Sequence, residues 1–106
     1  MDKLTGIEFK VVGVTFDDDV TGLNRQVFLQ GMKKTDPISL QREPQNQYDT
    51  NAVAVICNNN KIGYVGKQYA QILAPLMDQG RKFVAKIEDV DKYKSTYYCK
   101  IIVDEI

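Results

Sequence analysis

The chain has 106 residues, of which 43% are apolar and 26% are charged, and this is the size and balance of one globular domain. Basic and acidic residues number 14 each, and this zero net charge counts against a protein that coats duplex DNA through many phosphate contacts. The absence of histidine excludes Ser-His-Asp, Cys-His and histidine–metal sites, so we expect residues 1–106 to form a single domain that is not an enzyme.

The apolar runs and the two cysteines indicate the cellular compartment in which the protein is found. No apolar run approaches the roughly 20 residues that a membrane span needs, and no secretory leader is visible, so we expect a cytoplasmic protein without membrane contact. Cys57 and Cys99 are far apart and belong to no Cys-x-x-Cys pair. Such residues in a cytosolic protein are usually reduced and packed in the core. We therefore expect neither a metal site nor a cofactor.

In chain order, the first half predicts a long strand, a short helix and a second strand. Residues 6–16 are β-branched and aromatic, residues 17–22 form a polar loop, residues 23–33 suit a short helix, and residues 38–42 alternate as a strand does. The predicted faces of the short helix are apolar Leu23, Val27, Phe28 and Gly31 and polar Asn24, Arg25 and Gln26.

A hairpin and the main helix follow. Residues 52–57 and 61–65 predict paired strands around an asparagine turn. The next segment predicts a helix that ends at Gly80, and we expect Pro75 to kink or split it. Its apolar stripe has helical spacing and consists of Tyr69, Ile72, Leu73, Leu76 and Met77.

Two alternating strands end the chain. One face of the first carries Phe83, Ala85 and Ile87, and one face of the second carries Tyr97, Cys99, Ile101 and Val103. Residues 89–95 between them are charged, and we expect an exposed linker there. This order predicts a mainly β domain with some α structure (α+β). An antiparallel sheet of about six strands would curl into a small barrel with one main helix.

The loop after residue 42 carries the side chains best suited to recognition. Tyr48 offers a flat face on which a base can stack, Asp49 offers an acceptor, and Asn46 can read amides or base edges. The structural alternative is that asparagine and aspartate bond their own backbone in turns, and that the tyrosine covers the core. For Asp49 the two interpretations are balanced, whereas for Tyr48 we favour a ligand role.

A second group of candidates lies at the joint between the hairpin and the main helix. Gly63 and Gly66 let the backbone approach something closely, although plain turn geometry explains them equally well. Lys67 lies at the helix start, where exposed amides and the positive helix end favour an anion such as phosphate. Phe16 is either a second stacking wall or part of the core.

Three stretches of the chain resemble the HIRAN domain family. Its most specific signature reads Arg-Glu-Pro-x-Asn-x-Tyr-Asp-x-Asn-Ala-Val and corresponds here to residues 42–53. Residues 12–16 and 61–80 support the similarity, which is greatest to the members that occur alone in bacteria and phages. The resemblance implies a modified OB-like barrel. In helicase-attached members, this module captures the 3′-hydroxyl end of single-stranded DNA.

The resemblance also implies a set of site residues. Tyr48 would stack on the terminal base, Asp49 would accept from the 3′-hydroxyl, Phe16 would be the opposing wall, and Lys67 would hold a phosphate. The full expected nucleic-acid-binding set is Phe16, Arg42, Asn46, Tyr48, Asp49, Tyr64 and Lys67. Where helicase-attached members have an arginine and a histidine, this chain has Thr15 and Tyr64, which should weaken binding.

Three functional hypotheses follow. The leading one is a non-enzymatic module that recognises single-stranded DNA ends in repair or replication. The second is a protein-interaction module, an accessory subunit of a helicase or nuclease. The third is a metal-dependent nuclease that uses the acidic run Asp17, Asp18 and Asp19 with Glu43 or Asp49. The sequence leaves open whether the polymer is DNA or RNA, whether the protein self-associates, and which pathway it serves.

Overall fold

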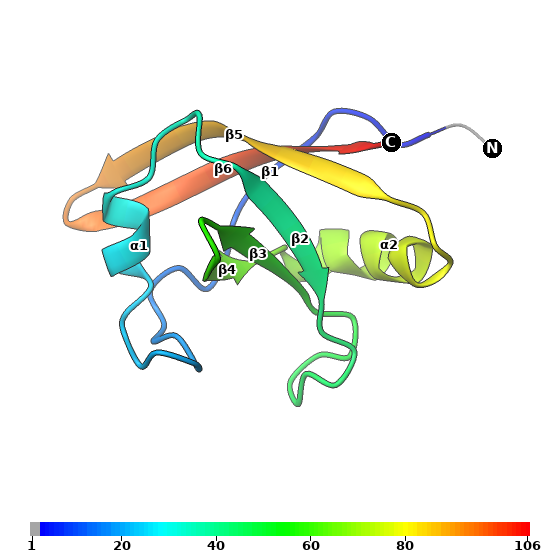
Figure 1. The fold of residues 1–106 in the computed structure, drawn as a ribbon, viewed down its shortest axis with the longest axis horizontal. Coiled ribbons are helices and arrows are strands. Elements are labelled where there is room, and N and C mark those ends of the chain that lie inside the picture. Colours follow the sequence, from blue (N-terminus) through cyan, green and yellow to red (C-terminus); the bar gives the residue numbers. More distant parts are fainter. Residues whose placement is uncertain (1–2) are drawn as a thin grey trace.

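The computed structural model describes residues 3–106, which form six strands and two helices (Figure 1). In chain order the elements are β1 (Ile7–Lys10), α1 (Gln26–Gln30), β2 (Ile38–Arg42), β3 (Val53–Cys57), β4 (Asn60–Tyr64), α2 (Lys67–Asp78), β5 (Phe83–Tyr93) and β6 (Thr96–Glu105). Neither helix in residues 3–106 is long and apolar enough to cross a membrane.

All strand pairs are antiparallel, and the strands follow the order β1-β6-β5-β2-β3-β4 across one curled sheet. Beyond β1 the chain reaches the opposite edge of the sheet, where Val12 and Tyr64 exchange two backbone hydrogen bonds of 2.9 and 2.8 Å. Figure 1 shows long β5 and β6 running across the top, the shorter strands turning away below them, and α2 at one end. This half-barrel with one main helix confirms the predicted mainly β fold.

Gly63 is required where the two edges meet. A side-chain carbon at this position would overlap the carbonyl oxygen of Val12 and would come within 2.7 Å of Cγ1 of Val11. The close approach expected at Gly63 is therefore made by the protein's own backbone. The absence of a side chain at Gly63 allows the backbone bridge between Val12 and Tyr64, and this bridge fixes the position of Tyr64.

The core lies between the inner face of the sheet and α2. Its buried side chains alternate along β6, as predicted, and pack with Ala70, Leu73 and Ala74 of the helix. Cys57 and Cys99 are both buried and unpaired, which confirms the expectation of two core thiols. Burial raises the pKa of Cys57 to about 11 and that of Cys99 to about 12, so neither forms a reactive thiolate at neutral pH.

The first predicted strand and the short helix are both longer in the prediction than in the structure. The strand ends at Lys10, since Val12 pairs with Tyr64 of β4 instead, and Gly13 then turns the chain with a φ of 71°. The helix covers only Gln26–Gln30, too few residues for helical spacing to select a buried face. The predicted faces are wrong for Leu23 and Val27, which are exposed, and for Arg25, which is buried, whereas Phe28 packs against the core as predicted.

Two predictions about the second half also need correction. Residues 89–93 belong to β5, and the hairpin turns at Lys94 and Ser95, because the charged side chains face solvent from a paired strand. The helix α2 continues through Pro75 without splitting, and the carbonyl of Pro75 still accepts from Gln79 at 3.1 Å. Ile72, predicted on the apolar stripe, is exposed, since the buried face is centred on Leu73.

Candidate functional site

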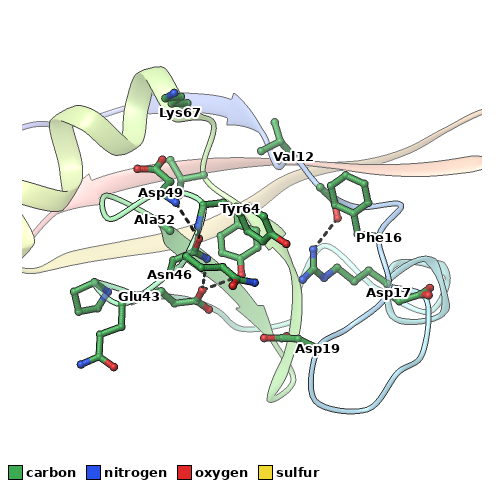
Figure 2. Close-up of a pocket in the computed structure, with 17 residues that line it drawn as sticks. Val12, Phe16, Asp17, Asp19, Glu43, Asn46, Asp49, Ala52, Tyr64 and Lys67 are labelled. Atoms are coloured by element: carbon green, nitrogen blue, oxygen red, sulfur yellow. Dashed lines mark hydrogen bonds between the residues drawn. The ribbon is translucent and has the colours of Figure 1, made fainter.

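Two loops on the same side of the half-barrel enclose an open cleft of about 1480 Å³ (Figures 1 and 2). One loop follows β1 and the other joins β2 to β3, and Tyr64 and Val65 lie between them. The second loop, residues 43–52, is called the recognition loop below. Six of the seven expected residues line this cleft, namely Phe16, Asn46, Tyr48, Asp49, Tyr64 and Lys67.

Arg42 is the exception, because it does not line the cleft. Its guanidinium makes two hydrogen bonds to Asp78, at 2.9 and 3.1 Å, and donates to the carbonyl of Ala52 at 2.8 Å. The hydrogen bond to Asp78 raises the pKa of Arg42 further. Arg42 therefore ties the end of the recognition loop to α2, and its role as a ligand contact stays a prediction.

Asn46 shapes the recognition loop from within. Its Oδ1 accepts from the backbone N–H groups of Tyr48, at 2.9 Å, and Asp49, at 3.1 Å, while its Nδ2 donates to Glu43 at 3.0 Å. Because its Oδ1 accepts twice and its Nδ2 donates once, Asn46 positions the next residues of the loop. The ring of Tyr48 is thereby turned outward and is 89% exposed.

One carboxylate oxygen of Asp49 stabilises the turn in which Asp49 itself lies. Its Oδ1 accepts from the N–H of Asn51 at 2.9 Å, as the structural interpretation requires. No hydrogen bond to its Oδ2 is found within residues 3–106, so the second oxygen remains available to a ligand. The two interpretations that the sequence left balanced are therefore compatible, because each uses a different oxygen.

Tyr64 joins the barrel to both loops through a charged network. Its hydroxyl donates to Glu43 at 2.8 Å and accepts from Lys61 at 3.0 Å. Lys61 also pairs with Glu43 at 2.7 Å and with Asp19 at 3.2 Å. Burial opposes both charges, yet the hydrogen bonds outweigh it, so that the pKa of Glu43 is lowered and that of Lys61 is raised. Sequence reasoning did not foresee the role of Lys61, since a lysine in a hairpin strand resembles any exposed one.

Arg25 is a further cleft residue that the sequence analysis did not select. Its guanidinium carbon lies 5.3 Å from the centroid of the Tyr64 ring, and its Nη1 donates to the carbonyl of Gly13 at 3.0 Å. The Tyr64 ring also has Lys61 at 5.1 Å, so two cations adjoin one aromatic ring. The irregular chain before α1 carries no periodic signal that could have predicted this burial.

Lys67 is the first residue of α2, at the rim of the cleft (Figure 2). Gly66 precedes it as the N-cap, and no side chain in residues 3–106 caps this end of the helix. The lysine is exposed, and the first amides of the helix leave a positive end that suits an anion.

The acidic run does not form a shared site. Asp18 is buried, and its Oδ2 accepts from the backbone and hydroxyl of Thr21 at 2.8 and 2.9 Å, which lowers its pKa. Asp17 accepts from Asn24, and Asp19 pairs with Lys61. Within residues 3–106, no three Asp, Glu or Cys side chains are grouped to hold a metal ion. The geometry thus gives no support to the nuclease hypothesis.

Together the fold and the cleft define a class: a small half-barrel domain that presents exposed rings and an acceptor on two loops, with a cation at the start of α2. Comparison of the sequence identifies the family, because residues 6–104 match the HIRAN domain. The chain belongs to the HIRAN domain family, as the resemblance in its sequence indicated.

Related proteins agree with this assignment. The chain is 46% identical over 57 residues to the helicase-like transcription factor of Oryctolagus cuniculus and 36% identical over 92 residues to the Fanconi-associated nuclease 1 homolog of Arabidopsis thaliana. These matches cover 53% and 77% of this chain but only 5% and 10% of the relatives.

Two solved structures have the same fold. A protein from Lactobacillus plantarum superposes with a TM-score of 0.76 at 29% identity, over 97% of this chain and 92% of that one. The HIRAN domain of human HLTF superposes with a TM-score of 0.72 at 22% identity, over 97% of this chain and 76% of that one.

Proposed function

We propose that this HIRAN domain is a non-enzymatic DNA-binding module that receives the 3′-hydroxyl end of a single strand in its cleft. The observation that carries the proposal is the convergence of Phe16, Tyr48, Asp49 and Lys67 from three distant stretches on one open surface. A base, a hydroxyl and a phosphate each find a matching group there. The names of the relatives, a transcription factor and a nuclease, are consistent with a role in DNA repair or replication.

Stacking supplies most of the expected affinity. Tyr48 is 89% and Phe16 is 67% exposed, and both line the cleft although neither ring contributes to the core. A ligand that covers these rings would remove their apolar surface from water, which is favourable. Base–aromatic stacking is worth about 1–3 kcal/mol per base and tolerates any sequence.

Asp49 supplies the preference for a free strand end. An ionised carboxylate only accepts hydrogen bonds, so its Oδ2 suits a hydroxyl donor and repels a phosphate at the same place. Lys67 and the uncapped start of α2 lie on the same cleft and suit a phosphate further along the strand.

The charge of the cleft limits the number of phosphate contacts. Four carboxylates line it, from Asp17, Asp19, Glu43 and Asp49, and Lys61 neutralises two of them through ion pairs. Affinity should therefore fall gently with salt, with a logarithmic slope of roughly −0.7 per phosphate contact for a single strand.

Tyr64 lies in the cleft but offers little to a ligand through its hydroxyl. That group already donates to Glu43 and accepts from Lys61, so it holds the loops in place. We infer that Tyr64 supports the recognition loop from below and presents only its ring to the bound strand.

A titration with labelled ten-nucleotide strands tests the proposal. A strand with a 3′-hydroxyl should bind about tenfold more tightly than the same strand with a 3′-phosphate, and Asp49→Asn should narrow that gap. A matched RNA strand decides between the two polymers. Equal binding of the two DNA ends would show that Asp49 does not read the hydroxyl.

A second function, as an accessory subunit of a helicase or nuclease, is favoured by one observation. Several apolar side chains are exposed on the segment before and within α1, and these are Phe16, Val20, Leu23 and Val27. Such a surface is typical of protein contacts. If no oligonucleotide moves the NMR signals of the Phe16 and Tyr48 rings, while Val20→Lys abolishes binding of a co-purified helicase or nuclease, this function replaces the first.

A further inference from the structure

A cation in the cleft is buried without an ion pair to any carboxylate of residues 3–106. Arg25 is only 4% exposed, yet within residues 3–106 its guanidinium makes one hydrogen bond, from Nη1 to the carbonyl of Gly13. Its Nε is buried, and no hydrogen-bond acceptor is found for it in that part of the chain. A guanidinium has five N–H donors, so most of its capacity is unused.

This state is costly for a protein to maintain. Buried charges are normally paired, and buried donors are normally satisfied. No carboxylate of residues 3–106 forms an ion pair with Arg25. The carboxylate of Asp18 attracts Arg25 electrostatically but forms no ion pair with it, and its Oδ2 accepts hydrogen bonds from Val20 and Thr21 instead. The unused N–H donors of Arg25 are therefore left for an anion from outside.

The surroundings hold the guanidinium rigidly beside the stacking residues. A side-chain carbon built at Gly13 would lie 3.5 Å from Nη1 of Arg25, 3.6 Å from the Phe16 ring and 3.8 Å from the Tyr64 ring. These three groups thus surround one point on the backbone, and Arg25 itself lines the cleft. A donor fixed in this way loses little side-chain entropy when it binds.

We infer that Arg25 is a phosphate-binding residue of the cleft. It would contact a backbone phosphate of the strand next to the Phe16 wall, whereas Lys67 on α2 would contact a different one. The inference rests on the proposed function and extends it. It assigns the cleft a second anion contact, on the segment between β1 and α1, in addition to the one at the start of α2.

A scan with neutral methylphosphonate linkages tests the contact. Each linkage of a ten-nucleotide strand is neutralised in turn, and affinity is measured for the unaltered protein, Arg25→Gln and Arg25→Lys. At one linkage, neutralisation should weaken the unaltered protein about tenfold and leave Arg25→Gln unaffected. Arg25→Gln should also reduce the salt slope by about 0.7, whereas Arg25→Lys should retain it. Lys86→Gln, an exposed lysine outside the cleft, is the matched control and should change neither.

The outcomes separate this inference from the proposed function. If the unaltered protein prefers 3′-hydroxyl ends but Arg25→Gln weakens every linkage equally, Arg25 is a structural residue and only this inference fails. If the unaltered protein binds no strand, both fail. Should Arg25→Gln not fold, the Nε–H NMR signal of Arg25 in the unaltered protein decides. It must shift with the natural strand and stay in place when that one linkage is neutral.

Discussion

The hydroxyl of Tyr64 donates a 2.8 Å hydrogen bond to Oε1 of Glu43, so the last residue of β4 holds the first residue of the recognition loop. Glu43 in turn accepts from Asn46, which sets the backbone of Tyr48 and Asp49. The exposed ring and carboxylate are therefore positioned by a chain of hydrogen bonds that begins in the barrel.

Glu43→Gln should reduce the loss of stability that the protein undergoes when the pH falls below about 4.5. Hydrogen bonds from Lys61, Asn46 and Tyr64 outweigh burial and hold the pKa of Glu43 below its ordinary value of 4.5. A lowered pKa contributes stability above that value and loses it as the pH falls. We expect the variant to be about 1–3 kcal/mol less stable at neutral pH, with the difference shrinking below pH 4.5. Urea unfolding at several pH values measures this, and a difference that stays constant would contradict it.

Tyr48→Ala should reduce affinity for single-stranded DNA without loss of stability. The ring is 89% exposed, so its removal costs the core nothing, whereas a lost stacking contact is worth about 1–3 kcal/mol. The matched control is Tyr93→Ala, because Tyr93 is also exposed but lies outside the cleft at the β5–β6 turn. Fluorescence anisotropy and thermal unfolding of both variants provide the comparison. Equal losses of affinity would show that the cleft is not the site.

Gly63→Ala should destabilise the half-barrel. The new methyl group would overlap the Val12 carbonyl oxygen and force apart the backbone bridge between Val12 and Tyr64. Overpacking of this kind costs about 1–3 kcal/mol or more. Gly31→Ala is the control, since no atom lies within 4 Å of the added carbon there. The midpoint of urea unfolding should fall for the first variant only.

Arg42→Gln should lower stability but leave the salt slope of DNA binding unchanged. The substitution removes the hydrogen bonds to Asp78 and to the Ala52 carbonyl, while Arg42 contributes nothing to the lining of the cleft. Affinities measured over a range of salt concentrations report the number of phosphate contacts. A slope that decreases by about 0.7 would mean that Arg42 does contact a phosphate.

Local patterns determined most of the architecture. The alternation along β2, β5 and β6 and the apolar spacing of α2 follow directly from side-chain periods of 2 and 3.6 residues. The signature at residues 42–53 also led to the family, and the loop and the two flanking stretches together led to six residues that line the cleft. Patterns failed where the chain is irregular, before α1, and where charged residues lie on the exposed half of β5.

Only the tertiary structure decided which polar groups are engaged and which are open. The sequence predicts Arg42 as a ligand contact and Arg25 as part of a polar helix face, yet the first is paired with Asp78 and the second is buried beside Tyr64 without an ion pair among residues 3–106. Their partners are distant in sequence: Asp78 is 36 residues from Arg42, and Tyr64 is on a different strand from the segment that carries Arg25. Composition and spacing describe neighbours along the chain, whereas hydrogen bonding and desolvation depend on neighbours in space.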